Sequence, residues 1–279
     1  MIRRPQTIFI LAAREIRDGL RNRWVASTIL LLGLLALALS YLGSAPTGEI
    51  KVGALEVSVV SLTSLSMYLL PLIALMLSFD ALVGEFEHGT MLLLLTYPVA
   101  RWQIIFGKFL GHATILLVAI VVGYGGALGV LILTGDGDAT GWQNYFAMMA
   151  STLLLGCVFL SIGYLISSLV RERAVAVGAA IGIWLLLVVL YDLGLLSMLM
   201  INEGEFISEG LFSALMLANP ADAYRLFNFT GFGEVGHLVG VIDVDADGQS
   251  SWLAPLVSMG LWVIIPFLLT TARFHQREL

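Results

Sequence analysis

The stretch GEFEHGTMLLLLTYPVARWQIIFGK, residues 84–108, is the only long connector with polar ends between two segments that are almost purely apolar. Acids stand near its start (Glu85, Glu87) and bases near its end (Arg101, Lys108). Connections between neighbouring helices usually need about 2–8 residues. This stretch is long enough to fold by itself, and it therefore predicts a contact with a partner.

The connector contains the pattern of a short helix. Thr90 can cap a helix over 91–96, and Gly89 allows the turn that leads into it. Pro98 ends this helix, because the residue before a proline disfavours helical dihedral angles. A second helix then begins near Arg101 and continues into the next apolar segment.

The short helix is rich in leucine, with Leu93 and Leu94 at its centre. An exposed apolar surface of this kind usually marks a protein interface. The alternative is a helix that lies among the lipid headgroups without a partner. The first interpretation makes the helix a handle, through which a soluble partner moves the two flanking spans.

Composition assigns the whole chain to the membrane proteins. Of its 279 residues, 59% are hydrophobic and 12% are charged, and the mean hydropathy is +0.95. A soluble domain has about 45–50% apolar and about 25% charged residues. The acidic pI of about 5.1 argues against nucleic acid as a ligand. The single cysteine, Cys157, cannot form a disulfide or a cysteine-based metal site within one chain.

Six segments are long and apolar enough to cross a bilayer, since about 20 residues are needed at 1.5 Å rise each. The expected spans are 24–42, 59–79, 109–133, 145–170, 174–200 and 253–271. The fourth carries many small and hydroxyl residues, which suit contact with other helices. The sequence thus predicts an all-α integral membrane protein with one transmembrane domain over 1–279.

Residues 1–23 precede the first span and are basic, with apolar residues at helical spacing. This pattern predicts an amphipathic helix on the cytoplasmic leaflet. The alternative is a charged flank that only sets topology. Basic residues also orient the rest of the chain. With both termini in the cytoplasm, 12 of the 14 Lys and Arg residues lie inside, and only Lys51 and Arg225 lie outside.

Residues 201–252 form the long outer loop of this topology. An apolar run at 211–218, too short to span, is followed by Asn219-Pro220-Ala221-Asp222. This run forms either a helix that dips into the outer leaflet and returns at Pro220, buried against the bundle, or an ordinary surface helix.

Catalytic and metal-binding motifs are missing from the sequence. It has no Gly-x-x-x-x-Gly-Lys-[Ser/Thr] phosphate-binding loop and no zinc-protease or calcium-loop pattern, so no metal site, cofactor or catalytic residue is expected. Asp192 lies within the fifth apolar segment, where an unpaired carboxylate is costly. It either lines a pathway for cargo or reaches the outer headgroups.

Several stretches together resemble a known family. Glu85…Gly89-Thr90…Leu93-Leu94…Pro98…Arg101…Gly107-Lys108 resembles the ATPase-coupling signature of type-2 ABC exporter permeases. The segments 14–24, 67–85, 89–112 and 219–232 are similar to the permease subunit of the transporter that matures nitrous oxide reductase. The segment 219–232, NPADAYRLFNFTGF, is the most specific of these.

The resemblance implies an architecture and a set of partners. It implies an N-terminal elbow helix, six spans, a cytoplasmic coupling helix within 84–108, a homodimer, and a cytoplasmic P-loop ATPase dimer that holds ATP and Mg²⁺. It also implies a periplasmic β-helical protein, with a copper chaperone as a further candidate partner. The expected location is a bacterial inner membrane.

The function implied is support for periplasmic assembly of the copper–sulfur centre of nitrous oxide reductase. The cargo is left open between a sulfur species, copper, and mechanical work on the periplasmic partner. Asn219, Asp222, Tyr224 and Arg225 are then expected to contact that partner, and Arg225 to pair with one of its acids or with Asp222. The alternatives are an ABC-2 exporter permease for another substrate, or an ATP-independent carrier or scaffold.

Overall fold

The computed structural model describes residues 6–43, 54–96, 99–134, 141–201, 209–230 and 252–276. Within these ranges the chain is helical and contains no strand, which confirms the all-α prediction. Pro98, and the parts of the predicted N-terminal helix and outer loop at 1–5, 202–208 and 231–251, lie outside the described residues.

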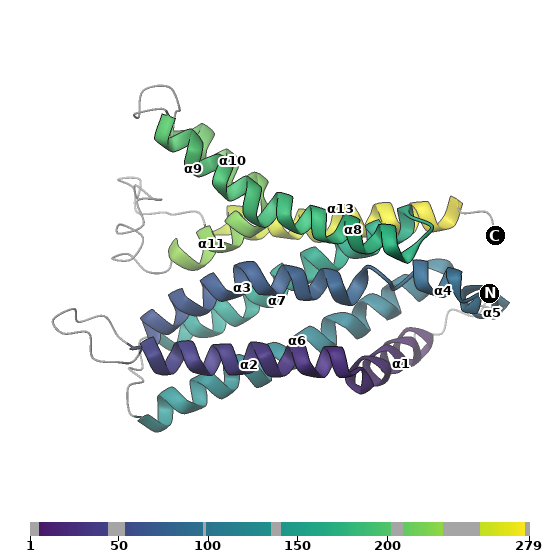
Figure 1. Ribbon diagram of the computed structural model, residues 1–279, viewed down its shortest axis with the longest axis horizontal. Coiled ribbons are helices and arrows are strands. Elements are labelled where there is room, and N and C mark those ends of the chain that lie inside the picture. The colour runs from purple at the N-terminus through teal and green to yellow at the C-terminus, as the bar shows by residue number, and fades with distance from the viewer. Residues whose placement is uncertain are drawn as a thin grey trace.

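The helices form one elongated bundle (Figure 1), and each predicted span lies along a long helix or a helical series to within one residue. The bundle comprises α2 (Arg23–Gly43), α3 (Ala54–Ser78), α6 (Arg101–Thr134), α7 (Trp142–Leu169), the series α8 (Arg173–Trp184), η2 (Leu185–Leu190) and α9 (Tyr191–Ile201), and α13 (Leu253–Gln276). Among the described residues, five helices meet the length and hydropathy needed to cross a membrane, and six do if the bent pair α1–α2 is counted as one span.

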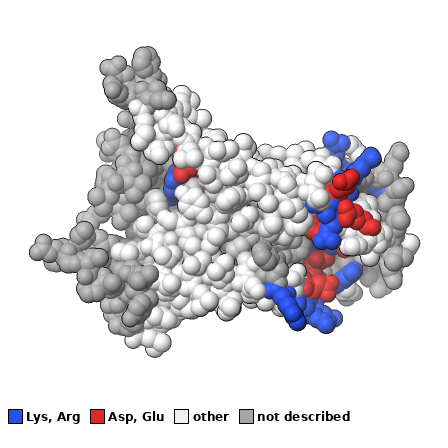
Figure 2. Space-filling model, in the orientation of Figure 1, with Lys and Arg blue, Asp and Glu red and all other residues white. Residues whose placement is uncertain are grey.

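One end of the bundle, here called the terminal end, carries α1 (Gln6–Arg21), α4 (Val83–Glu87), α5 (Thr90–Thr96) and the last turn of α13. At the opposite end, called the loop end, α2 ends and α7 begins. Charged side chains gather at the terminal end on the face shown in Figure 2, and a single small charged group lies near the loop end. An uncharged band separates the two, as the low dielectric of a bilayer requires.

Helix α7 is the centre of the bundle and packs against α3, α6 and α13. Glycines let its neighbours come close: a Cβ at Gly163 would lie 1.9 Å from Ser78 Oγ of α3, and one at Gly156 would lie 2.9 Å from Leu116 of α6. This confirms the prediction that the small and hydroxyl residues of the fourth span serve helix–helix contact. The α8–α9 series is the least buried of the five helices that could each cross a membrane. Only 17% of the residues in its most apolar stretch are buried inside the protein.

Helix α1 turns sharply away from the first span, at an angle of 72° to α2. It lies along α6 because that helix presents glycines to it. A Cβ at Gly107 would lie 2.8 Å from Leu11, and one at Gly111 would lie 2.6 Å from Glu15. The two glycines are four residues apart and so share one face of α6.

The outer segment folds into two helices, α10 (Glu209–Ala218) and α11 (Pro220–Thr230). In Figure 1, α10 runs inward from the loop end beside α9, and α11 returns toward that end. The break between them lies beside the middle of the α8–α9 series, because the Asn219 side chain donates to the Leu187 carbonyl at 2.7 Å. Of the two predicted alternatives, the structure has the helix that dips in and returns at Pro220.

Candidate ATPase-coupling site and outer polar cluster

The connector that opened the sequence analysis folds into α4, α5 and the start of α6. Gly89 joins α4 to α5 and has φ +68°, a backbone conformation that residues with a Cβ rarely adopt. The Thr90 hydroxyl donates to the Glu85 carbonyl at 3.3 Å and thereby fastens the start of α5 to α4. The predicted cap differs in this respect, since Thr90 caps the preceding turn.

Helix α5 packs one side against the bundle. Met91 is fully buried, and Leu94, one turn later, is half-buried against the same small core. This core also contains Tyr164 of α7 and Phe274 of α13. Leu94 follows Met91 by three residues and shares its inward face, so only part of its side chain is exposed in the single chain. The backbone of Leu93 also lies in α5, directly before Leu94.

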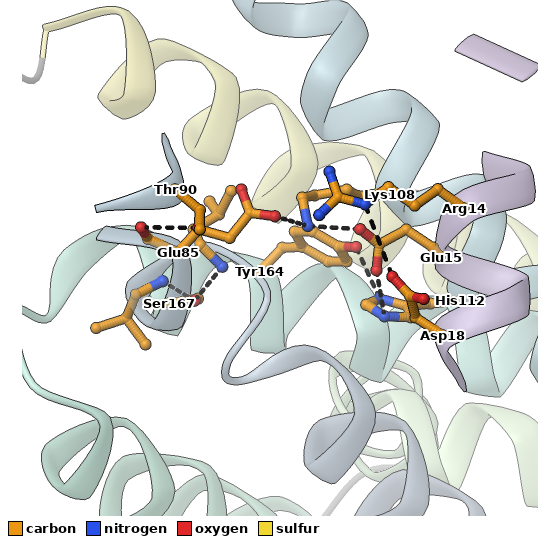
Figure 3. Close-up of polar contacts among 11 residues, drawn as sticks. Arg14, Glu15, Asp18, Glu85, Thr90, Lys108, His112, Tyr164 and Ser167 are labelled. Atoms are coloured by element: carbon orange, nitrogen blue, oxygen red, sulfur yellow. Dashed lines mark hydrogen bonds and ion pairs between the residues drawn. The ribbon is translucent and has the colours of Figure 1, made fainter. Parts of the chain in front are cut away.

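A buried ion cluster joins α1, α4 and α6 (Figure 3). The Lys108 ammonium lies 2.6 Å from Glu15 Oε1 and 2.7 Å from Glu85 Oε1, and its side chain is 5% exposed. His112 Nε2 lies 3.5 Å from Glu15 Oε2, and its Nδ1 shares a 2.7 Å hydrogen bond with the Tyr164 hydroxyl. Lys108 thus holds two carboxylates from helices that are distant in sequence.

The electrostatics of Glu15 follow from this arrangement. Burial alone would raise the pKa of its carboxyl, but the positive charges around it, Lys108 first, more than offset that effect, so the pKa lies below its ordinary value. Glu15 therefore stays ionised at neutral pH. The Lys108 ammonium lies between the carboxyls of Glu15 and Glu85 and is held in place strongly, because removing the lysine would leave buried acids without a counter-charge.

Span four also supports the connector. The Ser167 hydroxyl of α7 accepts hydrogen bonds at 3.0 Å from the backbone N–H groups of Leu82 and Val83. These groups begin α4 and would otherwise lack partners. At the start of α8, the Arg173 backbone N–H donates to Glu87 at 2.9 Å, and the Arg173 side chain pairs with Asp80.

Arg101 ties the start of α6 to the end of the last span. Its guanidinium donates to the carbonyls of Phe274 and His275 at 3.0 and 2.9 Å and lies 6.0 Å from the centre of the Phe274 ring. These carbonyls close α13 and have no partner within that helix. The connector is therefore fixed to the first, fourth, fifth and sixth expected spans, or to the helices that lead into them.

A second polar cluster lies at the break between α10 and α11. Asn219 is the N-cap of α11: its Oδ1 accepts from the Ala221 N–H at 3.1 Å, and Pro220 occupies the first helical position, where a missing N–H costs nothing. The Asn219 amide also donates to Leu187 and to Asp222. Leu187 lies in η2, a π-helical turn, where the altered backbone pattern frees a carbonyl for such a contact.

Arg225 is the basic member of this cluster. Arg225 donates to Asp192 at 2.7 Å and to Asp222 at 2.6 Å. Asp192 thus has a basic partner from another segment, which accounts for its position without a role in a pathway. Of the two pairings expected for Arg225, the structure has the one with Asp222.

The expectation that Asn219, Asp222 and Tyr224 contact a partner needs correction. Their side chains are at most 1% exposed, because α11 packs against α3, α7 and α13. The Tyr224 hydroxyl meets Thr152 of α7 at 2.8 Å. Only Arg225, with a quarter of its side chain exposed, reaches the surface of the single chain.

The end of α10 is capped by its neighbours. Its last carbonyls accept from Tyr191 (to Leu215, 2.7 Å), Ser258 (to Leu217) and Trp262 (to Ala218, 3.0 Å). A helix that ends inside a bilayer must satisfy these groups within the protein, because lipid offers no hydrogen bonds. In the described part of the chain, no group of three or more His, Cys, Asp or Glu residues is placed to hold a metal ion.

Comparison with known proteins agrees with this architecture. The model of the family described as ABC-2 family transporter protein matches residues 9–279. The chain belongs to this family.

Two curated relatives in the ABC-2 family are similar over nearly their whole length. Both are described as probable ABC transporter permease protein NosY. The protein of Stutzerimonas stutzeri is 41% identical over 276 residues, 97% of this chain and 98% of its own. That of Pseudomonas aeruginosa is 41% identical over 274 residues, 98% of this chain and 99% of its own. This chain is therefore a NosY-like, multi-pass ABC transporter permease, and such a permease works with an ATPase subunit.

Several residues of the candidate coupling site were not identified from sequence. Glu15, His112, Tyr164 and Ser167 are scattered among apolar or basic surroundings. The available signals are Glu15 as an acid on a basic helix and Lys108 inside an apolar one. Neither signal identifies a partner, because the contacts of these four residues join positions 52 to 97 apart in the sequence.

Proposed function

We propose that this permease couples ATP hydrolysis by a partner ATPase to assembly of the copper–sulfur centre of nitrous oxide reductase in the periplasm. The observation that carries the proposal is the buried Glu15–Lys108–Glu85 cluster, which joins the connector to α1 and α6. A force applied to α4 and α5 would be passed on to these helices. The 41% identity to two NosY permeases supports the choice of process.

The proposed orientation places the terminal end in the cytoplasm. Among described residues, the basic side chains at this end include Arg17, Arg101, Lys108 and Arg173, and Arg225 is the one base assigned to the other end, as the excess of positive charge on the cytoplasmic side requires. Residues 84–96 would then meet the ATPase, with Gly89 and Leu93 in the contact.

The proposed complex is a homodimer of this chain with an ATPase dimer below it and a periplasmic β-helical protein above it. A copper chaperone is a further partner on the periplasmic side. The cargo is a sulfur species or copper, or the work is motion of the α10–α11 pair against the periplasmic protein. For that third mode, Asp192 and Leu187 link α11 to the fifth span, whose first residue, Arg173, contacts Asp80 and Glu87 beside the connector.

Contact with the ATPase is tested by co-purification. The permease is expressed with an ABC-type ATPase from the same organism, as wild type, Gly89→Val or Leu93→Asp. Both variants are expected to lose the ATPase, because the first distorts the turn and the second places a charge in the contact. Gly182→Ala is the control, since a Cβ there meets nothing within 4 Å. Retention of the ATPase by both variants would refute the proposed contact.

The role in maturation is tested in the host. Deletion of the gene should yield a reductase that lacks the visible absorption of its copper–sulfur centre, and the wild-type gene should restore it. A fully matured reductase in the deletion strain would remove this role and leave the chain as a permease for another substrate.

A further inference from the structure

Helix α1 has three faces, and only one of them is covered by the protein. Leu11, Ala12 and Glu15 lie against the glycines of α6. A second face carries Phe9 and Leu20, which are 66% and 50% exposed. These two residues are eleven positions apart, about three helical turns, and so lie on the same side.

The third face is basic and exposed. Arg14, Arg17 and Arg21 follow one another at intervals of three and four residues, which places them along one side of the helix. Arg14 has an exposed partner, Asp18, at 3.7 Å. Arg17 and Arg21 have no ion pair or hydrogen bond to any described residue. The other acid of α1, Glu15, points away from this face and toward Lys108.

The position of α1 puts these two faces at the surface of the membrane. The first span, α2, begins two residues after α1 ends and leaves it at 72°. Helix α1 therefore lies beside the point where the chain enters the lipid. An apolar face next to a basic face matches the boundary between acyl chains and phosphate headgroups.

We propose that the exposed side of α1 binds an anionic phospholipid, with Arg17 and Arg21 on the headgroup phosphate and Phe9 and Leu20 among the acyl chains. Two guanidinium groups that have no acidic partner in the described part of the chain give the charge complementarity for a phosphate, which arginine binds in a bidentate manner. The lipid holds α1 from the side opposite to Lys108, so it steadies the helix on which the ion cluster depends.

The test uses the purified full-length chain in neutral detergent. Phosphatidylglycerol or phosphatidylethanolamine with the same acyl chains is titrated in, and bound lipid is counted by native mass spectrometry. The wild type should retain more phosphatidylglycerol than phosphatidylethanolamine. Arg17→Gln/Arg21→Gln should bind it about 25-fold more weakly, since each basic residue near an anionic surface contributes a factor of about five. Equal retention of both lipids by the wild type would overturn the proposal.

A matched control removes two exposed arginines from the same end of the bundle. Arg171→Gln/Arg273→Gln should bind phosphatidylglycerol like the wild type, because neither residue lies on α1. An equal loss in this control would show unspecific attraction and refute the site. The thermal midpoint of both double variants should match the wild type, and Arg17→Lys/Arg21→Lys should regain most of the binding.

The source of the phosphate group is tested by competition. Inorganic phosphate at millimolar concentration should displace little phosphatidylglycerol, because it lacks the acyl chains that Phe9 and Leu20 contact. Complete displacement would show a site for free phosphate and overturn the assignment to lipid.

Discussion

Lys108 illustrates how one residue organises the terminal end of the bundle. In the sequence, a lysine near the start of an apolar helix indicates the cytoplasmic end of a span. In the structure it is buried and holds an acid from α1 and another from α4. Its contribution is positional, because the charges cost desolvation energy that their mutual attraction must offset.

Replacement of Lys108 tests this role. Lys108→Met should leave Glu15 and Glu85 buried without a counter-charge and destabilise the protein by about 3–5 kcal/mol. The change is measured as a lower thermal midpoint in detergent. Glu15→Gln/Glu85→Gln/Lys108→Met should recover most of the loss, since the cluster is then neutral. No recovery would mean that Lys108 acts through packing alone.

The charges around Arg225 predict an order of effects. Arg225→Met leaves two acids side by side and should cost roughly 2–3 kcal/mol, below the value for a fully buried pair because a quarter of the side chain is exposed. Asp192→Asn should cost less, because Arg225 and Asp222 still form a pair. The thermal midpoints of the two variants measure this order. A larger loss of stability in Asp192→Asn than in Arg225→Met would contradict the prediction.

At the scale of elements, α1 depends on two glycines of α6. Gly111→Leu should push α1 away, because even a Cβ would lie 2.6 Å from Glu15 and 3.0 Å from the Ala12 carbonyl. The expected result is faster proteolysis between α1 and α2. Gly126→Ala on the same helix is the control, as a Cβ there meets nothing within 4 Å, and it should be neutral or slightly stabilising.

The break between α10 and α11 depends on Asn219. Asn219→Ala removes the N-cap and the donors to Leu187 and Asp222. A lost cap costs about 1 kcal/mol, and the unsatisfied buried partners add about 1–3 kcal/mol. Hydrogen exchange of the first turn of α11 should rise most. Exchange that changes evenly over the molecule would show that the cap is not what holds this turn.

At the scale of the whole molecule, the alternation of the spans predicts which ends share a side. In a Cys157→Ser background, Leu211→Cys should react with a membrane-impermeant thiol reagent on intact cells, and Arg171→Cys should react only after lysis. Both residues are exposed in the structure. The reverse pattern would invert the proposed orientation and place residues 84–96 outside the cell.

Much of the fold could be predicted because long apolar segments form helices, and helices cover the predicted segments 174–200 and 253–271. The structure around the candidate coupling site could be predicted only in part. Gly89 was placed correctly at a turn, whereas Leu94 was assigned to the surface and is half-buried. The inward side of a seven-residue helix depends on the helices beside it, and no periodic pattern in so short a run identifies that side.

By itself, the sequence determined that this chain is an all-helical membrane protein and that it turns at Gly89. These properties are local, because hydropathy and glycine act through their own segment. Only the tertiary structure decided that Lys108 joins Glu15 to Glu85, that Arg225 joins Asp192 to Asp222, and that Asn219 is buried. Such pairings depend on which helices pack together, and in a low-dielectric interior each buried charge takes the partner that packing brings to it.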